Sequence, residues 1–336
     1  MIPLLTPQQA LRPTAIALGS FDGLHQGHRR VIEAVTGLAG GPGPSSAVPT
    51  VVSFWPHPRE VLYGETRLRL DLPAEKLALL QPLGIRQLVL VPFTRALAAL
   101  SPEQFVREVL VGELQARSIA VGENFRFGSG RSGDTADLVR LGMASGIDVR
   151  VLPMLWDGPE RVSSSRIRRA LAAGEIDEVR RLLERPYRFS GRVVRGRGLG
   201  RELGWPTANL QVDGRKCLPL EGVYAALAWC DRVGDAPLAA VMNLGPQPTV
   251  DPAAPSAVEV HLIDRRVELE GARLTVEPLQ LLRRQCRFPD LDALVAQIGA
   301  DAEQAAALVQ ERSADGIGVG EAPADEQADA SEQQNP

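Results

Sequence analysis

Apolar and polar positions alternate between two patterns from residue 14 to about residue 183. Short runs rich in Val, Ile, Leu and Ala contain few polar residues, which is typical of strands buried on both faces. Between them lie longer stretches whose apolar residues recur every three or four positions, the spacing of an amphipathic helix. This alternation predicts an α/β domain: a parallel sheet with helices on both faces, which binds ligands at the carboxyl ends of its strands. The expected strands are TAIALGSF (14–21), TVVSF (50–54), QLVLVPF (87–93), SIAVG (118–122) and DVRVLP (148–153), and the expected helices are HRRVIEAVTGL (28–38), AEKLALLQPLG (74–84), PEQFVREVLVGELQA (102–116) and DTADLVRLGMA (134–144).

The pattern changes after the helical stretch RIRRALAAGEIDEVRRLLERPY (166–187). Strand-like runs now follow one another, separated by Gly, Pro and Asp, and a long helical pattern returns only at residues 291–312. This order predicts an antiparallel barrel or sandwich closed by one C-terminal helix. The expected strands are FSGRVVRG (189–196), TANLQV (207–212), GVYAALAWC (222–230), LAAVMNLG (238–245), AVEVHLID (257–264) and ARLTVEPLQLL (272–282).

The change of pattern places a domain boundary near Arg185–Tyr187 and divides the chain into residues 1–185, 186–312 and 313–336. The last segment contains too few apolar residues to bury a core, so we expect it to be a disordered acidic tail. It holds six acidic residues and no Lys or Arg; removing their charge from the net charge of −4 leaves +2 on the rest of the chain. A nearly neutral folded part argues against a nucleic-acid partner bound by bulk charge.

Length, composition and cysteine usage narrow the class further. A chain of 336 residues with 44% hydrophobic residues is long enough for two cores. Its three cysteines lie far apart without a CxxC pair, which favours free, buried thiols in a reducing cytosol. The first residues lack the pattern of a signal peptide, and the apolar runs are too short or too rich in Gly and Pro to span a membrane. We expect a cytoplasmic protein without a membrane partner, and leave a weak homo-oligomer open.

Two histidines stand where the first expected strand gives way to the first expected helix, in GSFDGLHQGH (19–28). Gly19 and Gly23 allow the backbone to pass close to a ligand, and the helix N-terminus offers free N–H groups to an anion. His25 and His28 can lie on the same side of the first turn and donate hydrogen bonds to phosphate oxygens. The pattern favours ATP over zinc, because no third ligand follows at a customary spacing. The alternative is a pair of histidines that cap or pack the helix start.

Two later segments fit the same candidate site. VGENFRFGSGRSGD ends an expected strand in a glycine-rich loop with Asn124 and Arg126, which suits a flat ring and a phosphate. RVSSSRIRRAL offers three serines as helix N-caps, Ser164 among them, before Arg166 and Arg168. Hydroxyl, backbone N–H and guanidinium groups would then converge on a polyphosphate.

The second half of the chain contains its own basic glycine loop, GRVVRGRGLGRELGWPTANL (191–210). Such a loop offers backbone amides to phosphates, and Thr207 and Asn209, two apart on an extended strand, direct both side-chain oxygens to one face, where they can bind Mg²⁺. Glu259 and His261 share one face of the expected strand AVEVHLID. A carboxylate in an apolar strand costs free energy unless it is paired or bound, so Glu259 is a candidate general base. The alternatives are a hairpin with solvated arginines and a salt-bridged structural glutamate.

These motifs, taken together and in order, closely resemble the bacterial bifunctional riboflavin kinase/FMN adenylyltransferase (FAD synthetase) family. The resemblance runs from about residue 14 to residue 310 and leaves out only the tail. It implies a Rossmann-like nucleotidyltransferase domain followed by a riboflavin-kinase barrel. The motifs that carry it are GSFDGLHQGH, VVSFWPHPREVL, VGENFRFGSGRSGD, VSSSRIR, GRGLGRELGWPTANL, GVYA, VMNLGPQPT and VEVHLID.

The resemblance implies two reactions: riboflavin and ATP give FMN and ADP in the barrel, and FMN and ATP give FAD and pyrophosphate in the first domain. It implies that His25 and His28 hold the ATP phosphates for adenylyl transfer, that Thr207 and Asn209 bind Mg²⁺ with ATP, and that Glu259 takes the proton of the terminal ribityl hydroxyl. Other ATP-binding residues are Gly19, Phe21, Asp22, Gly23, Ser164, Arg168, Gly196, Gly200 and Gly204, and the flavin-binding residues are Asn124, Arg126 and Arg283.

A few positions depart from the family pattern. Ser20 stands where the family usually has Asn, and Trp55 where it commonly has Glu. Gln247 and Glu270, both in the second domain, replace residues that are often Arg and Tyr. These departures motivate one alternative, a monofunctional FMN adenylyltransferase whose barrel binds flavin without phosphorylating it. A flavin-responsive regulatory protein is a third alternative, although the first domain contains no DNA-reading pair of helices.

Overall fold

The structure is a computed structural model that describes residues 2–39, 47–196, 199–245, 258–265 and 267–314. The chain forms two compact units. Among the described residues, unit 1 contains those up to Arg67 and the segment Asp71–Ser164, and unit 2 contains Leu68–Leu70 and those from Ser165 onward. The predicted acidic tail lies, from residue 315 on, outside the described residues, and the predicted boundary after residue 185 stays a prediction.

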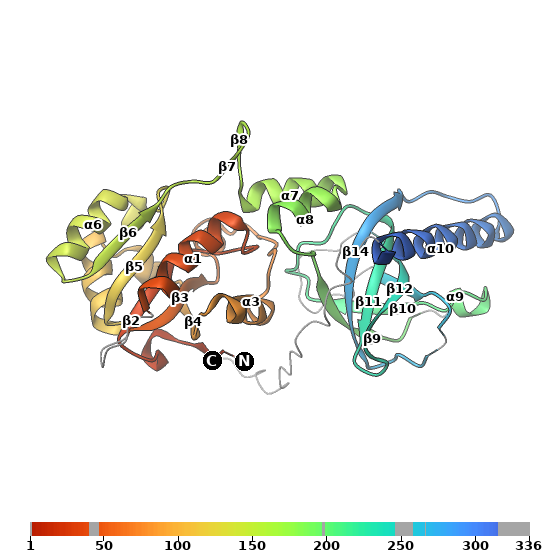
Figure 1. Cartoon of the computed structure of the whole chain (residues 1–336), viewed down its shortest axis with the longest axis horizontal. Coiled ribbons are helices and arrows are strands. Elements are labelled where there is room, and N and C mark those ends of the chain that lie inside the picture. Colours follow the sequence, from red (N-terminus) through yellow and green to blue (C-terminus); the bar gives the residue numbers. More distant parts are fainter. Residues whose placement is uncertain (1, 40–46, 197–198, 246–257, 266, 315–336) are drawn as a thin grey trace. The chain divides into compact units, whose positions relative to one another are not determined.

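Unit 1 is built on a six-stranded parallel sheet with the order β1–β4–β3–β2–β5–β6 (Figure 1). Its strands are β1 (Leu4–Leu5), β2 (Thr14–Leu18), β3 (Val48–Trp55), β4 (Gln87–Pro92), β5 (Ala116–Gly122) and β6 (Asp148–Leu152). All five predicted strands are present, and the two-residue β1 was too short to predict. One expectation was wrong: β6 is not buried on both faces, because it is the edge strand and each of its residues is exposed or half-buried.

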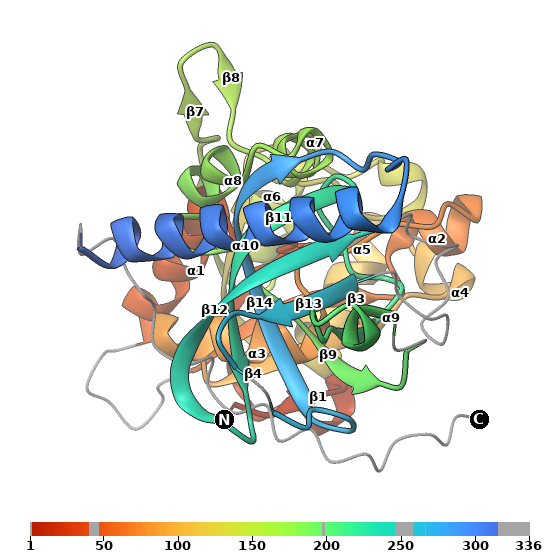
Figure 2. The same cartoon turned by 90° about the vertical axis from the view of Figure 1, so that its right-hand side faces the viewer.

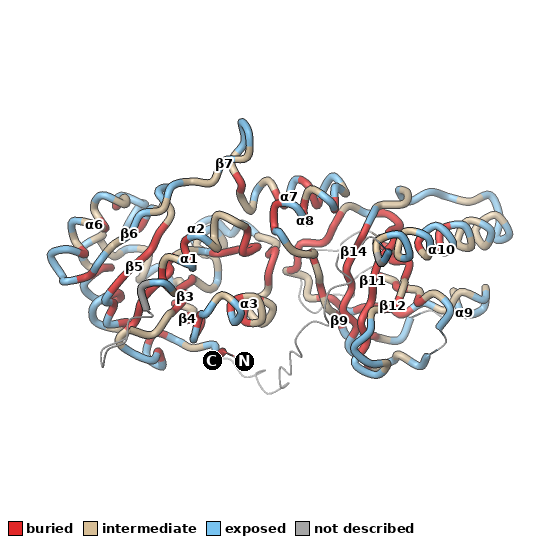
Figure 3. Tube along the Cα trace, viewed as in Figure 1, coloured by how far each residue is buried: buried red, intermediate tan, exposed pale blue. Residues whose placement is uncertain are grey.

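Helices cover both faces of this sheet, as predicted. Ala15 and Ala17 of β2 pack against one set of helices, whereas Ile16 and Leu18 pack against the other. Since helices cover both of its faces, the strand is fully buried (Figure 3). This packing removes its apolar surface from water. On one face lie α1 (Gln26–Ala39) and α3 (Pro73–Leu80), and on the other lie α5 (Pro102–Phe105), the π-helical turn Val106–Glu113 and α6 (Thr135–Ala144).

Shorter elements complete unit 1. Two short helices, α2 and α4, and a small hairpin, β7–β8, were not predicted from the sequence. Their bounds are α2 (Pro58–Tyr63), α4 (Arg95–Ala98), β7 (Trp156–Asp157) and β8 (Glu160–Arg161), and 3-10 turns lie at Pro7–Gln9, Gln81–Leu83 and Ser129–Arg131.

Unit 2 contains α7 (Ser164–Ala173) from its second residue on, α8 (Ile176–Leu183) and a closed antiparallel barrel. Both a barrel and a sandwich were compatible with the sequence pattern. The first and last strands of the sheet, β9 and β10, pair with each other, so the sheet is a closed barrel. The strands are β9 (Phe189–Val194), β10 (Ala208–Val212), β11 (Gly222–Cys230), β12 (Gly234–Leu244), β13 (Val258–Leu262) and β14 (Arg273–Arg283), and the loop after β9 carries the short helix α9 (Leu199–Glu202).

The C-terminal helix α10 (Leu291–Ala314) lies across β11 and β12 of the barrel (Figure 2). Val223, Ala225 and Leu227 of β11 form one apolar cluster with Ala302 and Ala305 of the helix. This packing explains why every residue of β11 is buried, although one of its faces points out of the barrel. Within the described part of the chain, none of the helices combines the length and the apolar character that a membrane-spanning helix needs.

Candidate active sites

The loop between β2 and α1 follows an unusual backbone path. Phe21 and Leu24 have φ values of 44° and 39°, and Gly23 has a φ of 91°. Left-handed backbone costs free energy for residues with a Cβ atom. The side chains of Phe21 and Leu24 are buried in the core of unit 1, and this packing offsets the cost. The path of the predicted phosphate-binding turn is therefore determined by the core beneath it.

Hydrogen bonds join this loop to distant parts of unit 1. The Ser164 hydroxyl donates to the carbonyl oxygen of Asp22 at 2.7 Å. The carbonyl oxygen of Ser20 accepts from Nζ of Lys76 at 3.1 Å and from the hydroxyl of Ser53 at 3.2 Å. The structure thus brings the glycine turn and Ser164 together, as the sequence predicted, and adds the buried ammonium group of Lys76.

His25 and His28 lie side by side at the start of α1. Their rings stack with a centroid distance of 3.7 Å and an interplanar angle of 19°. Burial is the main cause that lowers the pKa of His25 to about 4, with the positive charge of Arg161 acting in the same direction. Burial also lowers the pKa of His28 well below its ordinary value. Both imidazoles are therefore neutral near pH 7, and Nδ1 of His28 has no hydrogen-bond partner among the described residues.

The loop after β5 places Asn124 and Arg126 at the surface of unit 1. The Arg126 guanidinium lies 3.3 Å from a carboxylate oxygen of Asp134, and both side chains are about half exposed. Asp134 also caps α6, because its side chain accepts hydrogen bonds from the backbone of Ala136 and Asp137. Exposed ion pairs contribute about 0–1 kcal/mol, so an incoming phosphate can compete for Arg126 at little cost.

The two arginines that follow Ser164 belong to unit 2 and have different partners. Arg166 forms an ion pair with Glu178 of α8 at 2.6 Å, and both side chains are largely shielded from solvent. Nε of Arg168 donates to the carbonyl oxygen of Leu68 at 3.3 Å. Arg166 thus joins α7 to α8, which the sequence pattern did not predict.

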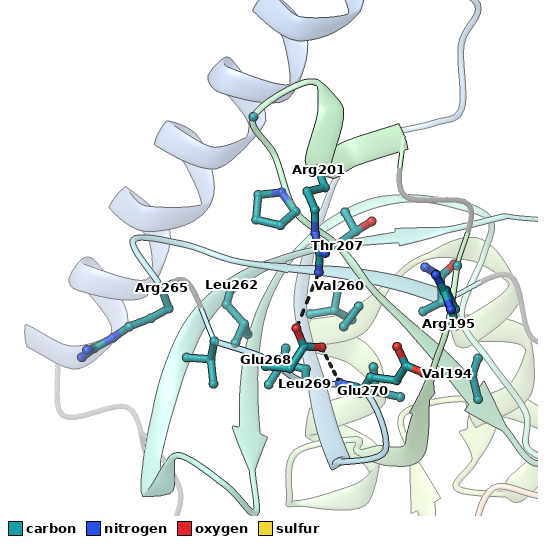
Figure 4. A pocket seen from close by; sticks show the side chains of 17 residues that line it. Val194, Arg195, Arg201, Thr207, Val260, Leu262, Arg265, Glu268, Leu269 and Glu270 are labelled. Carbon is teal, nitrogen blue, oxygen red and sulfur yellow. Dashed lines mark hydrogen bonds and ion pairs between the residues drawn. The ribbon is translucent and has the colours of Figure 1, made fainter.

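Unit 2 contains a cavity of about 800 Å³ that is lined by the glycine loop, by residues of β9, β10 and β13, and by the segment that precedes β14. Figure 4 shows the side chains that line it, with Thr207 and Arg201 near one another and Glu268 reaching towards Arg201. Arg201 and Glu268 are 3.8 Å apart and both are exposed, so this ion pair is weak. Glu270, one of the departures from the family pattern, also lines the cavity.

At two positions of the glycine loop, other atoms of the protein lie so close to the backbone that only glycine fits. A Cβ atom at Gly196 would overlap the side-chain amide of Asn209, and one at Gly200 would overlap the carbonyl oxygen of Trp205. Gly204 adopts a φ of 84°, which favours glycine. Thr207 and Asn209 both line the cavity, although β10 begins one residue after Thr207, and their binding of Mg²⁺ stays a prediction.

Glu259 lies on β13, in register with Asn209 of β10 on one side and Asn243 of β12 on the other. Its two strand neighbours, Val258 and Val260, are buried on the opposite face, as predicted. Nδ2 of Asn243 donates to a carboxylate oxygen of Glu259 at 3.5 Å. No cation neutralises this carboxylate in the ion pairs of the described residues, which distinguishes it from an ordinary salt-bridged glutamate.

Comparison with known proteins identifies both units. Residues 7–166 match the FAD synthetase family model, and residues 183–309 match the riboflavin kinase family model. The bifunctional riboflavin kinase/FMN adenylyltransferase of Escherichia coli strain K12 is 37% identical over 288 residues, covering 85% of this chain and 90% of the relative. This chain belongs to that bifunctional family. The predicted family is thereby confirmed.

Two further relatives extend the comparison. The bifunctional riboflavin kinase/FMN adenylyltransferase of Pseudomonas fluorescens is 39% identical over 298 residues, covering 88% of this chain and 93% of the relative. A crystal structure described as a macrolide-efflux protein from Streptococcus pneumoniae is 28% identical, with a TM-score of 0.77, and the match covers 90% of this chain and 97% of the other. The family resemblance therefore spans both units.

Within the riboflavin-kinase barrel, Arg283 has well-defined protein partners. Its guanidinium donates to both carboxylate oxygens of Asp301 on α10, at 2.8–3.1 Å, and Asp301 is almost fully buried. This pair joins the end of β14 to α10. Binding of flavin by Arg283 remains a prediction, and Gln247 lies outside the described residues.

The cysteines partly contradict the sequence prediction. All three are free, and Cys217 and Cys230 are buried, but Cys286 is exposed. It follows the end of β14 in the segment that leads to α10, where the side chains of Arg284 and Gln285 are exposed as well. The expectation of three buried thiols was wrong because this connection lies on the surface.

Sequence reasoning missed three residues of these sites. Asn243 was inside a predicted strand, and its polarity among apolar neighbours was the same signal that singled out Glu259. Gln285 donates to Oδ1 of Asn243 at 2.6 Å, a contact with no sequence signal. Lys76 lay within an expected helix, and only the fold shows that it reaches Ser20.

Proposed function

We propose that this chain makes FMN from riboflavin in the barrel and FAD from FMN in unit 1, using ATP in both reactions. The observation that carries the proposal is the match of both family models to one chain, each over a unit with its own glycine-containing loop. The relatives that match along both units are named as bifunctional enzymes. The alternative of a barrel that only binds flavin receives no comparable support.

In the kinase reaction, the terminal ribityl hydroxyl attacks the γ-phosphorus of ATP. A bond forms between that oxygen and phosphorus, the bond from phosphorus to the β–γ bridging oxygen breaks, and ADP leaves. The hydroxyl proton passes to Glu259, which acts as general base. Asn243 orients this carboxylate by donating to one of its oxygens. Phosphoryl transfer otherwise depends on positioning and on neutralising charge.

Thr207 and Asn209 would hold Mg²⁺ in the barrel. The residues fit this ion, since Mg²⁺ prefers oxygen ligands, and the hydroxyl of Thr207 and the amide oxygen of Asn209 belong to one cavity. The Asn209 amide occupies the space that a Cβ atom at residue 196 would need. Glycine at this position therefore leaves room for the Asn209 side chain. When bound, Mg²⁺ neutralises negative charge on the phosphates.

In the adenylyltransferase reaction, a phosphate oxygen of FMN attacks the α-phosphorus of a second ATP. The bond from the α-phosphorus to the α–β bridging oxygen breaks, and pyrophosphate leaves without a covalent enzyme intermediate. His25 and His28 stabilise the charge that develops on the phosphates by donating N–H hydrogen bonds, which neutral imidazoles can do. Ser164 contributes by holding the carbonyl of Asp22 and hence the turn. Asn124, Arg126 and Arg168 are proposed to bind the substrates.

Product stoichiometry tests this proposal. Purified protein supplied with riboflavin, Mg²⁺ and excess ATP should release equal amounts of ADP and pyrophosphate for each FAD formed. With FMN as the starting substrate it should release pyrophosphate and no ADP. Pyrophosphate from FMN combined with unchanged riboflavin would support the monofunctional alternative, and failure of both reactions would overturn the proposal.

A further inference from the structure

His261 lies on β13, two residues after Glu259 and on the same face of the strand. Its ring nitrogen Nδ1 is 2.8 Å from the carbonyl oxygen of Pro206. A carbonyl oxygen can only accept a hydrogen bond, so Nδ1 must carry the proton. The side chain is only half-buried, yet one tautomer of the neutral ring is selected by this contact.

The Pro206 carbonyl belongs to the peptide bond whose nitrogen is that of Thr207. The β10 ladder with β13 begins one residue later, at Ala208 opposite Val260. Asn209 is therefore held by the ladder, opposite Glu259. Thr207 lies just before the ladder. The hydrogen bond from His261 fixes the peptide unit that joins Pro206 to Thr207.

Trp205 supports the same contact from the other side. Its ring meets the His261 ring edge-on, with a centroid distance of 5.2 Å and an interplanar angle of 71°. Trp205 also packs against the apolar cluster under α10, and its backbone N–H donates to the carbonyl of Gly200 at 2.7 Å. The apolar cluster under α10 and the Gly200 carbonyl thus both hold Trp205, and the His261 ring packs against it.

We propose that His261 is a positioning residue for the riboflavin-kinase reaction: by holding the Pro206 carbonyl, it places the Thr207 hydroxyl where it can bind Mg²⁺ together with Asn209. This inference rests on the proposed kinase function of the barrel. His261 acts through the backbone and does not touch the reacting atoms. Strand β13 would then contribute both the general base and the support for the metal-binding hydroxyl.

Two substitutions separate the hydrogen bond from the packing of the ring. Asn in place of His261 keeps an N–H donor at the position of Nδ1 and loses the ring. Phe keeps a ring against Trp205 and loses the donor. The proposal expects His261→Asn to resemble the wild type and His261→Phe to require about tenfold more Mg²⁺ for half-maximal FMN formation, which corresponds to about 1.4 kcal/mol. FMN adenylylation in unit 1 should be unchanged in both variants and serves as the internal control.

Amide hydrogen exchange provides a readout that does not depend on activity. In the ligand-free protein, the peptide covering residues 205–212 should exchange faster in His261→Phe than in the wild type, while His261→Asn stays protected. Unchanged exchange in His261→Phe would overturn the role proposed for His261, whether or not the wild type phosphorylates riboflavin. Failure of the wild type to phosphorylate riboflavin would refute the kinase function instead. Faster exchange with an unchanged Mg²⁺ requirement would also overturn it, because His261 would then have only a structural role.

Discussion

Asn209 and Glu259 face each other across the ladder between β10 and β13. The residue proposed to hold Mg²⁺ and the residue proposed to accept the proton therefore share one register position of the barrel. A closed ladder changes little when a ligand enters, so the distance between the metal-binding and proton-accepting groups is set before substrates bind. We expect this preorganisation to favour phosphoryl transfer in the barrel.

Asn243→Asp should shift the pH dependence of FMN formation. The substitution places a second carboxylate where Asn243 Nδ2 now donates to Glu259 at 3.5 Å. Two negative charges so close together disfavour ionisation and should raise the pKa of the Glu259 carboxyl. The acid limb of the pH–rate profile should move to higher pH. Asn243→Ala is the control, since it removes the hydrogen bond without adding charge and should lower the rate with a smaller shift. Identical profiles for Asn243→Asp and the wild type would contradict the proposed role of Glu259 as the base.

The stability of unit 1 should fall as the pH is lowered from about 6.5 towards 4. Burial holds the pKa of His25 at about 4 and that of His28 below its ordinary value of 6.5. As the pH falls, these histidines are protonated in the unfolded chain before they are protonated in the folded protein. Each of them therefore lowers the free energy of unfolding by up to about 1.4 kcal/mol per pH unit between these pH values.

Thermal unfolding from pH 7 to pH 5, compared between the wild type and His25→Gln, measures this effect. The variant should lose stability less steeply on acidification. Parallel curves for the two proteins would show that His25 is not held neutral by its surroundings.

Gly196→Ala should impair the kinase alone. The added Cβ atom would overlap the Asn209 amide, so either the loop or the proposed Mg²⁺-binding side chain must move. We expect FMN formation to fall at least about tenfold in kcat/KM, a loss of about 1.4 kcal/mol, with FMN adenylylation unchanged. Gly299→Ala in α10 is a matched control, because its Cβ would make only ordinary contact with Trp205. Equal activity of both variants would contradict the close approach of the loop to Asn209.

Arg283→Met should destabilise the barrel by about 3–5 kcal/mol, because it leaves the carboxylate of Asp301 buried without its cation. Adding Asp301→Leu to this variant should recover part of the loss. Chemical denaturation followed by a signal from unit 2 gives these values. If Arg283→Met instead unfolds like the wild type and only weakens flavin binding, the ion pair with Asp301 is not the main role of this residue.

The strands with apolar residues on both faces were predictable because burial on two sides leaves an unambiguous pattern, as in β2 and β5. The edge strand β6 was misjudged, since Val149 and Val151 give the same pattern whether or not a helix covers them. Closure of the barrel depends on the pairing of β9 with β10, which no local pattern encodes.

The candidate sites were predictable where one short segment contains them, as with His25 and His28 on one helical turn. The surroundings of Glu259 were predictable only in part, because Asn243 reaches it through strand register, and Gln285 contacts Asn243 from a position 42 residues away in sequence. The bond from His261 to Pro206 likewise joins residues 55 apart. Such contacts follow from the closed barrel, and periodicity along the chain cannot reveal them.

We infer that one chain contains two separate ATP-dependent sites that act in sequence. A chromatographic time course of riboflavin, FMN and FAD, run with Mg²⁺ and ATP on the wild type, His28→Ala and Glu259→Gln, tests it most directly. We expect the wild type to form FAD, His28→Ala to stop at FMN, and Glu259→Gln to convert FMN but leave riboflavin unchanged. Loss of both reactions in either folded variant, or loss of neither, would contradict it.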